Sequence, residues 1–341
     1  MPTEPIVLTG HSRDVTHVTF NHDGDLFFSC ARDKTCQVWY SKDGERLGSY
    51  DHNGAVTRCQ PTLDSKYLVT SSTDALAQVF EVETGKRLQN YSHKLPVRDV
   101  AWAVGNEMFV SLQQASPSTP STIFLWQFDA ATADPNVPET ECLREIKLTG
   151  DHARFGAFSR VVFLNDISTI LAIHADGYIT KWDIGEEELL ASARIAEPKK
   201  DGPIISDLLS DITLTADRGL ALITSRNNNA YLVNTDTLEV VKTYTSDRPL
   251  NSGCISPILN HVLLGGGQDK HQVTTTAGAE GRFEVQFFHT FYEEKLTEVQ
   301  GHYGPVNSVA ISRDGRIFCS AAEDGTVRLY HFDEGYLKSS Y

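Results

Sequence analysis

Histidine and aspartate residues recur in this sequence at a spacing that could support chemistry. Three histidines are each followed, 22 residues later, by an aspartate: His11 by Asp33, His52 by Asp74 and His302 by Asp324. An imidazole beside a carboxylate can act as a general acid or base, or can ligate a divalent metal. A single catalytic or metal centre needs its groups to converge, however, whereas these pairs recur along the whole chain. We therefore interpret each pair as structural, with the histidine facing the aspartate of its own repeat.

Motifs of nucleophilic and phosphate-binding sites are lacking. The sequence has no G-x-S-x-G elbow and no G-x-x-x-x-G-K-[ST] loop, and the glycine-rich run LGGGQDKH (264–271) lacks the final hydroxyl residue of such a loop. No two cysteines form a C-x-x-C pair, which argues against a zinc or redox motif and favours buried free thiols. The six cysteines are Cys30, Cys36, Cys59, Cys142, Cys254 and Cys319. We predict no catalytic residue, no metal and no cofactor.

The charge balance disfavours nucleic acid as a direct partner. Of 341 residues, 30 are Lys or Arg and 45 are Asp or Glu, so the formal net charge is 30 − 45 = −15. Such a field repels phosphate unless a local basic patch opposes it. The strongest basic cluster, Lys199-Lys200, is flanked by Glu197 and Asp201. No stretch approaches the roughly 18 apolar residues of a membrane helix. These features predict a cytoplasmic protein that binds neither nucleic acid nor membrane directly.

The histidines belong to an internal repeat. His11, His52 and His93 are 41 residues apart, and segment 301–332 repeats the internal distances of segment 10–40. Intervening copies are degraded but traceable, so we count seven units within a single domain, 1–341. Their approximate bounds are 11–51, 52–92, 93–148, 152–195, 203–244, 248–299 and 302–332. A period of about 40 residues indicates a repeat architecture in which each unit is one supersecondary element.

Each unit contains runs of alternating apolar and β-branched residues bounded by turn signals. VTHVTF, LFFSCA, TCQVWY and ERLGSY in the first unit are typical, and such alternation predicts short antiparallel strands. The segment GEEELLASARI (185–195) contains strong helix formers, so a helix is the alternative there. The repeat frame nevertheless predicts that it is the fourth strand of the fourth unit.

The period, the Gly-His start and a Trp-Asp-like end of each unit resemble WD40 repeats. Only Trp182-Asp183 matches the literal dipeptide. The resemblance implies an all-β, seven-bladed WD40 β-propeller. The seventh unit has no clear fourth strand, whereas PIVLTG (5–10) precedes the first unit as a spare. We predict that this N-terminal strand completes the last blade and removes an open sheet edge.

In WD40 blades a histidine, a strand hydroxyl, a turn aspartate and an indole can form one chain of hydrogen bonds. The first unit offers His11, Ser29, Asp33 and Trp39. The second offers His52, Thr70 and Asp74, followed by Phe80, which cannot donate. The fourth offers His152, Asp176 and Trp182. The seventh offers His302, Ser320, Asp324 and Tyr330, whose hydroxyl could replace the indole.

Three longer segments, 24–56, 247–289 and 299–332, resemble the WD-repeat i subunit of eukaryotic translation initiation factor 3. The middle one combines a triple glycine, Val-Thr-Thr-Thr and a Gly-Arg-Phe-Glu-Val-Gln-Phe-Phe-His strand, which the fold does not require. The resemblance implies a non-catalytic scaffold that joins subunits b and g in a module acting on the 40S ribosomal subunit. It also implies that blades five and six hold a helical segment of subunit b, and that a peptide of subunit g docks on the propeller. The corresponding contact positions are Asp217, which keeps the family's carboxylate, and Asn234. At position 234, relatives tend to carry Asp instead. The acidity of the chain also favours a basic partner segment.

Two other functions stay open. The chain could be a WD40 adaptor of another complex, such as a signalling or ubiquitin-ligase scaffold. It could also be a hydrolase propeller with a central metal or carboxylate site, which requires acidic residues clustered at the axis.

Overall fold

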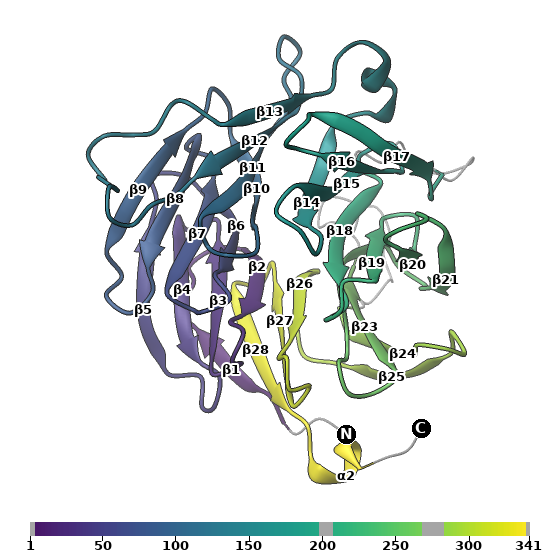
Figure 1. Ribbon diagram of the computed structural model, residues 1–341. Coiled ribbons are helices and arrows are strands. Elements are labelled where there is room, and N and C mark those ends of the chain that lie inside the picture. The colour runs from purple at the N-terminus through teal and green to yellow at the C-terminus, as the bar shows by residue number, and fades with distance from the viewer. Residues whose placement is uncertain (1–3, 198–206, 268–282, 339–341) are drawn as a thin grey trace.

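The chain folds into a ring of antiparallel sheets. The computed structural model describes residues 4–197, 207–267 and 283–338, and these form seven four-stranded sheets arranged around a central axis (Figure 1). In every sheet, the first strand of the sequence repeat lies at the edge that faces the axis. The predicted all-β, seven-bladed propeller is therefore confirmed.

The first four blades follow one another along the chain. Blade one consists of β2 (Val15–Phe20), β3 (Leu26–Ala31), β4 (Thr35–Tyr40) and β5 (Arg46–Asp51). Blade two consists of β6 (Val56–Pro61), β7 (Tyr67–Ser72), β8 (Leu76–Glu81) and β9 (Arg87–Ser92). Blade three consists of β10 (Val97–Trp102), β11 (Met108–Gln113), β12 (Thr122–Gln127) and β13 (Arg144–Lys147). Blade four consists of β14 (Phe158–Phe163), β15 (Thr169–His174), β16 (Tyr178–Asp183) and β17 (Glu188–Arg194), preceded by the 3₁₀ helix η1 (Gly150–Phe155).

The remaining blades complete the ring. Blade five consists of β18 (Leu209–Leu214), β19 (Leu220–Ser225), β20 (Asn229–Asn234) and β21 (Val240–Thr245). Blade six consists of β22 (Leu250–Ile255), β23 (His261–Gly266), β24 (Val285–His289) and β25 (Lys295–Val299). Blade seven consists of β26 (Val306–Ile311), β27 (Ile317–Ala322), β28 (Thr326–His331) and β1 (Ile6–Thr9). Lys199-Lys200 and residues 268–271 of the 264–271 run lie outside the described residues.

The segment with strong helix formers is a strand. β17 pairs antiparallel with β16 over its whole length, and its residues alternate between exposed and half-buried. Leu190 on this edge strand is half exposed, so the strand packs loosely on its outer side. Pairing with β16 therefore outweighs the local helix propensity, and the prediction of a strand is confirmed.

Hydrophobic contact between neighbouring sheets forms the core. The buried side chains divide into clusters that each span two adjacent blades. Phe28 of β3 and Phe80 of β8, for example, belong to one such cluster between blades one and two. The inner two strands of every sheet carry a register irregularity after the first residue of the inner strand. Such bulges increase strand twist, which suits sheets packed radially.

The N-terminal strand closes the ring as predicted. β1 pairs antiparallel with β28, from Ile6 opposite Leu329 to Thr9 opposite Thr326. Leu8 is buried in a cluster that also contains Trp39 of blade one, while Val7 points outward and is 46% exposed. One non-covalent strand therefore joins the beginning of the chain to its last blade.

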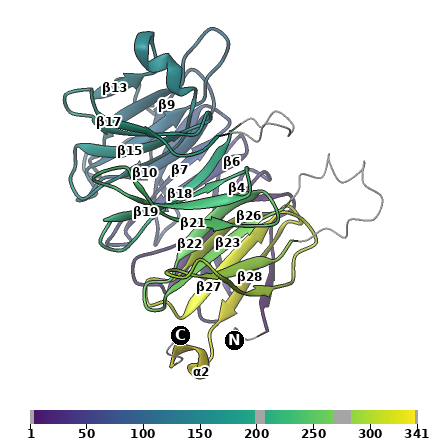
Figure 2. The same cartoon turned by 90° about the vertical axis from the view of Figure 1, so that its right-hand side faces the viewer.

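A short helix follows the last strand of the sequence. α2 (Glu334–Leu337) projects from the end of β28 in both views (Figures 1 and 2). Asp333 caps it by accepting the backbone N–H of Tyr336, and the Tyr336 ring stacks on Phe332 at 4.3 Å. Among the residues that the structure describes, no helix has the length and apolar character needed to cross a membrane.

We predict that Leu8→Ala lowers the free energy of unfolding by about 2 to 4 kcal/mol, because it removes a buried side chain from the closing strand. Val7→Ala is the matched control, and its effect should stay within about 0.5 kcal/mol because Val7 is on the exposed face. Urea unfolding of both variants measures the difference. Equal effects of the two substitutions would show that β1 does not close the ring in solution.

Candidate functional site

Blade one contains a continuous chain of side-chain hydrogen bonds. The Trp39 indole donates to Ser29 Oγ at 2.8 Å, Ser29 Oγ is 2.7 Å from His11 Nε2, and His11 Nδ1 is 2.9 Å from Asp33 Oδ2. With Nδ1 protonated, the hydroxyl donates to Nε2, and every group has a partner. Asp33 also accepts the Thr35 hydroxyl at 2.8 Å. The network ties the loop before β2 to β3 and to the turn that follows it.

The network recurs in blades two and seven. His52 lies 2.7 Å from Thr70 Oγ1 and 3.2 Å from Asp74 Oδ2. His302 lies 2.8 Å from Ser320 Oγ and 3.0 Å from Asp324 Oδ2. Tyr330 is buried at the indole position of blade seven, and burial raises the pKa of its phenol, while the charge of Arg328 and the Ser320 side chain oppose that rise. Phe80 places only a ring edge against His52.

These histidines are sealed inside the blades. The side chain of His11 is 1% exposed, and burial lowers its pKa although Asp33 opposes the shift. Burial raises the pKa of Asp74, but the interactions with His52, the backbone N–H of Asn53 and Ser72 together outweigh it, and the pKa falls to about 2. A neutral imidazole held between a hydroxyl and a carboxylate has no remaining group for a substrate or a metal.

Blade three builds the network from residues that sequence reasoning did not select. His93 Nε2 lies 2.6 Å from Ser111 Oγ, which also accepts the Trp126 indole at 2.7 Å. In place of the turn aspartate, the Gln113 side-chain oxygen accepts the backbone N–H of Lys94 at 3.0 Å. His93 and Ser111 are 18 residues apart, as are His11 and Ser29. This spacing could have identified the blade-three pair from the sequence.

Blade four departs from the predicted arrangement. Within the described part of the chain, no hydrogen bond joins His152 to Asp176. Instead, Thr180 Oγ1 lies 2.7 Å from His174 Nε2 and accepts the Trp182 indole at 2.8 Å.

The sequence explains this rearrangement. Ala172 occupies the position of the strand hydroxyl, since it pairs with Thr180 as Ser29 pairs with Gln37. His152 is also two residues farther from its aspartate than in the other units, and it lies in η1. Its Nδ1 is buried without a hydrogen-bond partner, and its ring contacts Trp182 edge-on at 5.0 Å.

The axis of the ring carries a second polar system that the sequence analysis missed. The third residue of every inner strand is polar, and we call this set the axial ring: His17, Arg58, Asp99, Arg160, Asp211, Ser252 and Ser308. Four of them, His17, Arg58, Asp211 and Ser308, line a central cavity of about 400 Å³. His17, Arg58 and Asp99 follow one another at intervals of 41 residues, so the repeat could have identified these axial positions from the sequence.

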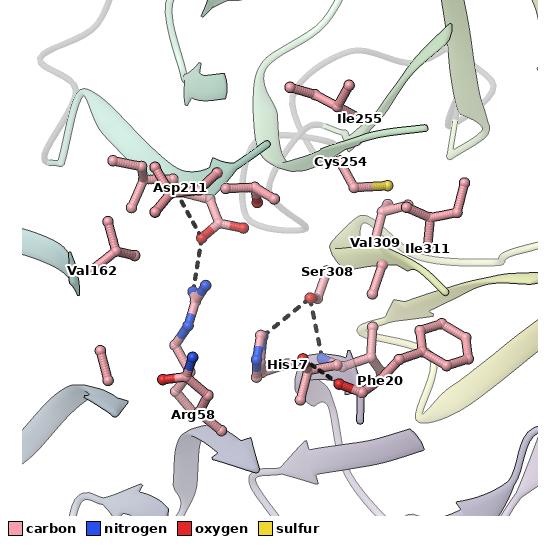
Figure 3. Close-up of a pocket in the computed structure, with 18 of the residues that line it drawn as sticks. His17, Phe20, Arg58, Val162, Asp211, Cys254, Ile255, Ser308, Val309 and Ile311 are labelled. Carbon is pink, nitrogen blue, oxygen red and sulfur yellow. Dashed lines mark hydrogen bonds and ion pairs between the residues drawn. The ribbon is translucent and has the colours of Figure 1, made fainter. Parts of the chain in front are cut away.

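Charged members of this axial ring neutralise one another. Arg58 extends across the cavity to Asp211, with Nη1 2.8 Å from Oδ1 (Figure 3). Its Nε lies 3.2 Å from Asp99. Arg160 lies 3.8 Å from Asp211, and burial lowers its pKa to about 10. Acidic residues therefore do cluster at the axis, as a hydrolase propeller requires. Each of them is paired with arginine, which leaves no carboxylate pair to activate water or hold a cation.

Uncharged members of the axial ring connect adjacent blades. Ser308 accepts the backbone N–H of Val18 at 3.1 Å, and Ser252 accepts that of Val309 at 3.2 Å. Asp99 likewise accepts the N–H of Val161 at 2.9 Å. These bonds join the inner strands of neighbouring sheets, whose backbones do not otherwise pair across the seam. The axial ring is thus a structural belt.

Both predicted contact residues lie at turns of blade five. Asp217 is exposed between β18 and β19, and its carboxylate accepts the Thr215 hydroxyl at 2.6 Å, which lowers its pKa. Asn234 ends β20, where its side-chain oxygen accepts the N–H groups of Asp236 and Thr237. In an antiparallel sheet the first and third turns lie at the same end, so both residues belong to one face of the ring.

The same face of blade six exposes large apolar side chains. Phe291 and Tyr292 lie in the turn between β24 and β25, and they are 59% and 73% exposed. Ile258, in the first turn of this blade, is also half exposed. Lys242 of blade five donates to the backbone oxygen of Phe291 at 3.0 Å, which fixes this turn beside blade five. Exposed aromatics beside acidic turns are typical of a protein-binding surface.

Seven radial sheets, four of which pair the repeat histidine with a strand hydroxyl, define a WD40-repeat β-propeller. The EIF3I family model matches residues 3–341. Eukaryotic translation initiation factor 3 subunit I of Candida glabrata is 35% identical over 340 residues, covering 99% of this chain and 95% of that protein. The proteins of that name from Drosophila melanogaster and Schizosaccharomyces pombe are 35% and 34% identical, with 99% of both chains covered in each case. The chain belongs to the EIF3I family, and the resemblance inferred from the sequence is confirmed.

We predict that Ser29→Ala destabilises the protein by about 2 to 4 kcal/mol, because the indole of Trp39 and Nε2 of His11 both lose their partner inside the blade. Ser49→Ala is the matched control, since Ser49 is exposed on the outer strand of the same blade. Chemical denaturation of the two variants gives the comparison. A Ser29→Ala loss as small as that of Ser49→Ala would contradict a structural role of the network.

We predict that stability falls between pH 7 and pH 5. Burial lowers the pKa of His93 and of His174 to about 4, whereas an unfolded histidine has a pKa near 6.5. The unfolded chain therefore takes up more protons below pH 6.5, so stability is full above that pH and is lost as the pH falls toward 4. Each histidine should contribute about 2 kcal/mol to this loss.

The free energy of unfolding at pH 7 and at pH 5 tests this expectation. His93→Gln cannot titrate, so the variant should lose about 2 kcal/mol less than the parent protein over this interval, whatever its stability at pH 7. An unchanged pH difference would mean that His93 is not held neutral in the fold.

Proposed function

We propose that this protein is a non-catalytic scaffold subunit of eukaryotic translation initiation factor 3 that acts in the cytoplasm. The observation that carries the proposal is end-to-end similarity to proteins named subunit I, over 99% of the chain in fungi and fly. The pairing of axial carboxylates with arginines and the sealed histidines agree with a role that needs no reacting groups. Within the factor, the chain joins subunits b and g in a module that acts on the 40S ribosomal subunit.

We propose further that one face of blades five and six holds a helical segment of subunit b. A helix that binds a flat surface needs apolar contacts for its affinity and charges for its orientation. The apolar contacts can come from three exposed side chains, Phe291, Tyr292 and Ile258. The charges can come from the exposed carboxylates of Asp217 and Asp236. This face therefore suits a segment with apolar anchors and basic flanks.

The two contact positions carried over from the family have different roles in this proposal. The Asp217 carboxylate is oriented by Thr215 and Gly219 and stays exposed, so it can meet a basic side chain. The Asn234 side-chain oxygen is used by the turn, and an aspartate there could accept the same two N–H groups. We therefore assign the charge contact to Asp217 and a turn-forming role to Asn234.

A WD40 adaptor of another complex is the alternative function. Such an adaptor would use the same fold and the same kind of surface, so the fold does not distinguish it from a translation factor subunit. The segment from GGGQ to FFH (265–289) distinguishes them, because a chain in which it could be replaced without effect would favour the other adaptor. Replacing this segment should abolish assembly with subunits b and g if the proposal holds.

We predict that a tagged copy of the full chain purifies with subunits b and g and with 40S particles.

Tyr292→Asp should weaken the binding of subunit b at least about 10-fold, because it places a charge in an apolar contact where aromatic anchors contribute about 2 kcal/mol or more. Quantitative mass spectrometry of the captured proteins measures the first result, and titration with the purified b segment measures the second.

Tyr303→Asp provides the matched control. Tyr303 is 87% exposed but lies between β25 and β26, at the opposite end of the sheets from the turn of Tyr292. This variant should bind subunit b like the parent chain. Equal loss in both variants would contradict the assigned face, and capture of unrelated complexes without 40S particles would contradict the function itself.

A further inference from the structure

Three cysteines that are separate in sequence meet inside the protein. Cys30 of β3 lies directly opposite Cys36 of β4, and Cys59 of β6 approaches them from the next blade. Their sulfur atoms all lie within 4.8 Å of one another. The three residues are 0%, 0% and 1% exposed. The spacing along the chain gave no hint of this cluster, because it forms only when blades one and two pack together.

The surroundings of the cluster are apolar. The buried neighbours in the same core cluster are Phe28, Val38, Tyr50, Val56, Leu68 and Phe80. Within the described residues, no histidine, carboxylate or further cysteine joins the three sulfurs as a ligand group. Zinc in structural sites takes four ligands in a tetrahedron, and a dry shell supplies no water for the fourth position. The site therefore suits a soft ion that is satisfied by three thiolates.

The geometry allows the three sulfurs to close on one ion. A metal–thiolate bond of about 2.3 Å places the sulfurs of a trigonal site about 4 Å apart. Side chains that already lie within 4.8 Å reach this separation by small rotations of their Cα–Cβ bonds.

We propose that Cys30, Cys36 and Cys59 form a three-thiolate site for monovalent copper at the seam between blades one and two. Three copper–sulfur bonds form, the thiol protons leave to solvent, and neither copper nor sulfur changes oxidation state. The ion links β3 and β4 of blade one to β6 of blade two. Its binding therefore stabilises this seam as well as occupying the site.

Copper binding by the full chain tests the proposal. The protein is prepared without oxygen, and Cu(I) is added either to the folded chain or during refolding, since the site is closed in the folded state. Competition with the chelator bicinchoninate should give one tightly held copper per chain, and the melting temperature should rise. X-ray absorption of the copper-loaded parent protein should show three sulfur ligands at about 2.3 Å.

Two substitutions separate this site from other thiols. Cys59→Ser should weaken copper binding at least about 10-fold by removing the ligand from blade two. Cys142→Ser is the control, because Cys142 is the half-buried cysteine outside the cluster and should bind copper as the parent does. Copper held by fewer than three sulfurs, copper lost in Cys142→Ser, or no copper retained after refolding would each overturn the proposal. The absorption measurement decides the case even if Cys59→Ser does not fold.

Discussion

The packing of each sheet between two neighbours is the contact on which this structure depends. A four-stranded sheet with two apolar faces is stable only when both are covered, and seven such sheets satisfy one another only as a closed ring. Hydrophobic clusters bridge the seams, including the last one between blades seven and one. The ring closes without a covalent link inside blade seven, where β1 pairs with β28, and across the seam Ser308 accepts the N–H of Val18.

Two systems of polar groups reinforce this packing at different places. The histidine networks fix the turns within blades, whereas the axial belt joins the inner strands of adjacent blades. A second row supports the belt: Thr16 donates to the backbone oxygen of Val56, and Thr57 to that of Val97. In the described structure, blade four has three buried polar side-chain atoms without a hydrogen-bond partner, on His152, Ser159 and Arg160, whereas blades one, two, six and seven have one or two each. Such atoms cost stability, so the irregular unit is also a weak point of the ring.

A ring that uses its polar side chains internally acts through its surfaces. The axial carboxylates are paired, and the blade histidines are enclosed, so recognition falls to turns and outer strands. The face that combines Asp217 with the aromatic turn of blade six offers apolar area and negative charge together. The cysteine cluster is different, because it lies inside a seam, and an ion bound there would act on the stability of the ring.

The sequence by itself determined the architecture, because each blade is a local unit of about 41 consecutive residues. Its turn residues, its alternation of apolar and polar residues and the spacing of its repeated histidines and aspartates all lie within that unit. It also determined the networks of blades one, two and seven, where His11 and its equivalents keep their distance from hydroxyl and aspartate. Tertiary structure alone decided the rest. The shift of the blade-four network to Thr180 depends on which hydroxyl the indole reaches across two strands. Two contacts form between different units: Arg58 pairs with Asp211, and Cys59 approaches two cysteines of blade one. The distance between units depends on how the sheets pack around the axis, which no single repeat specifies.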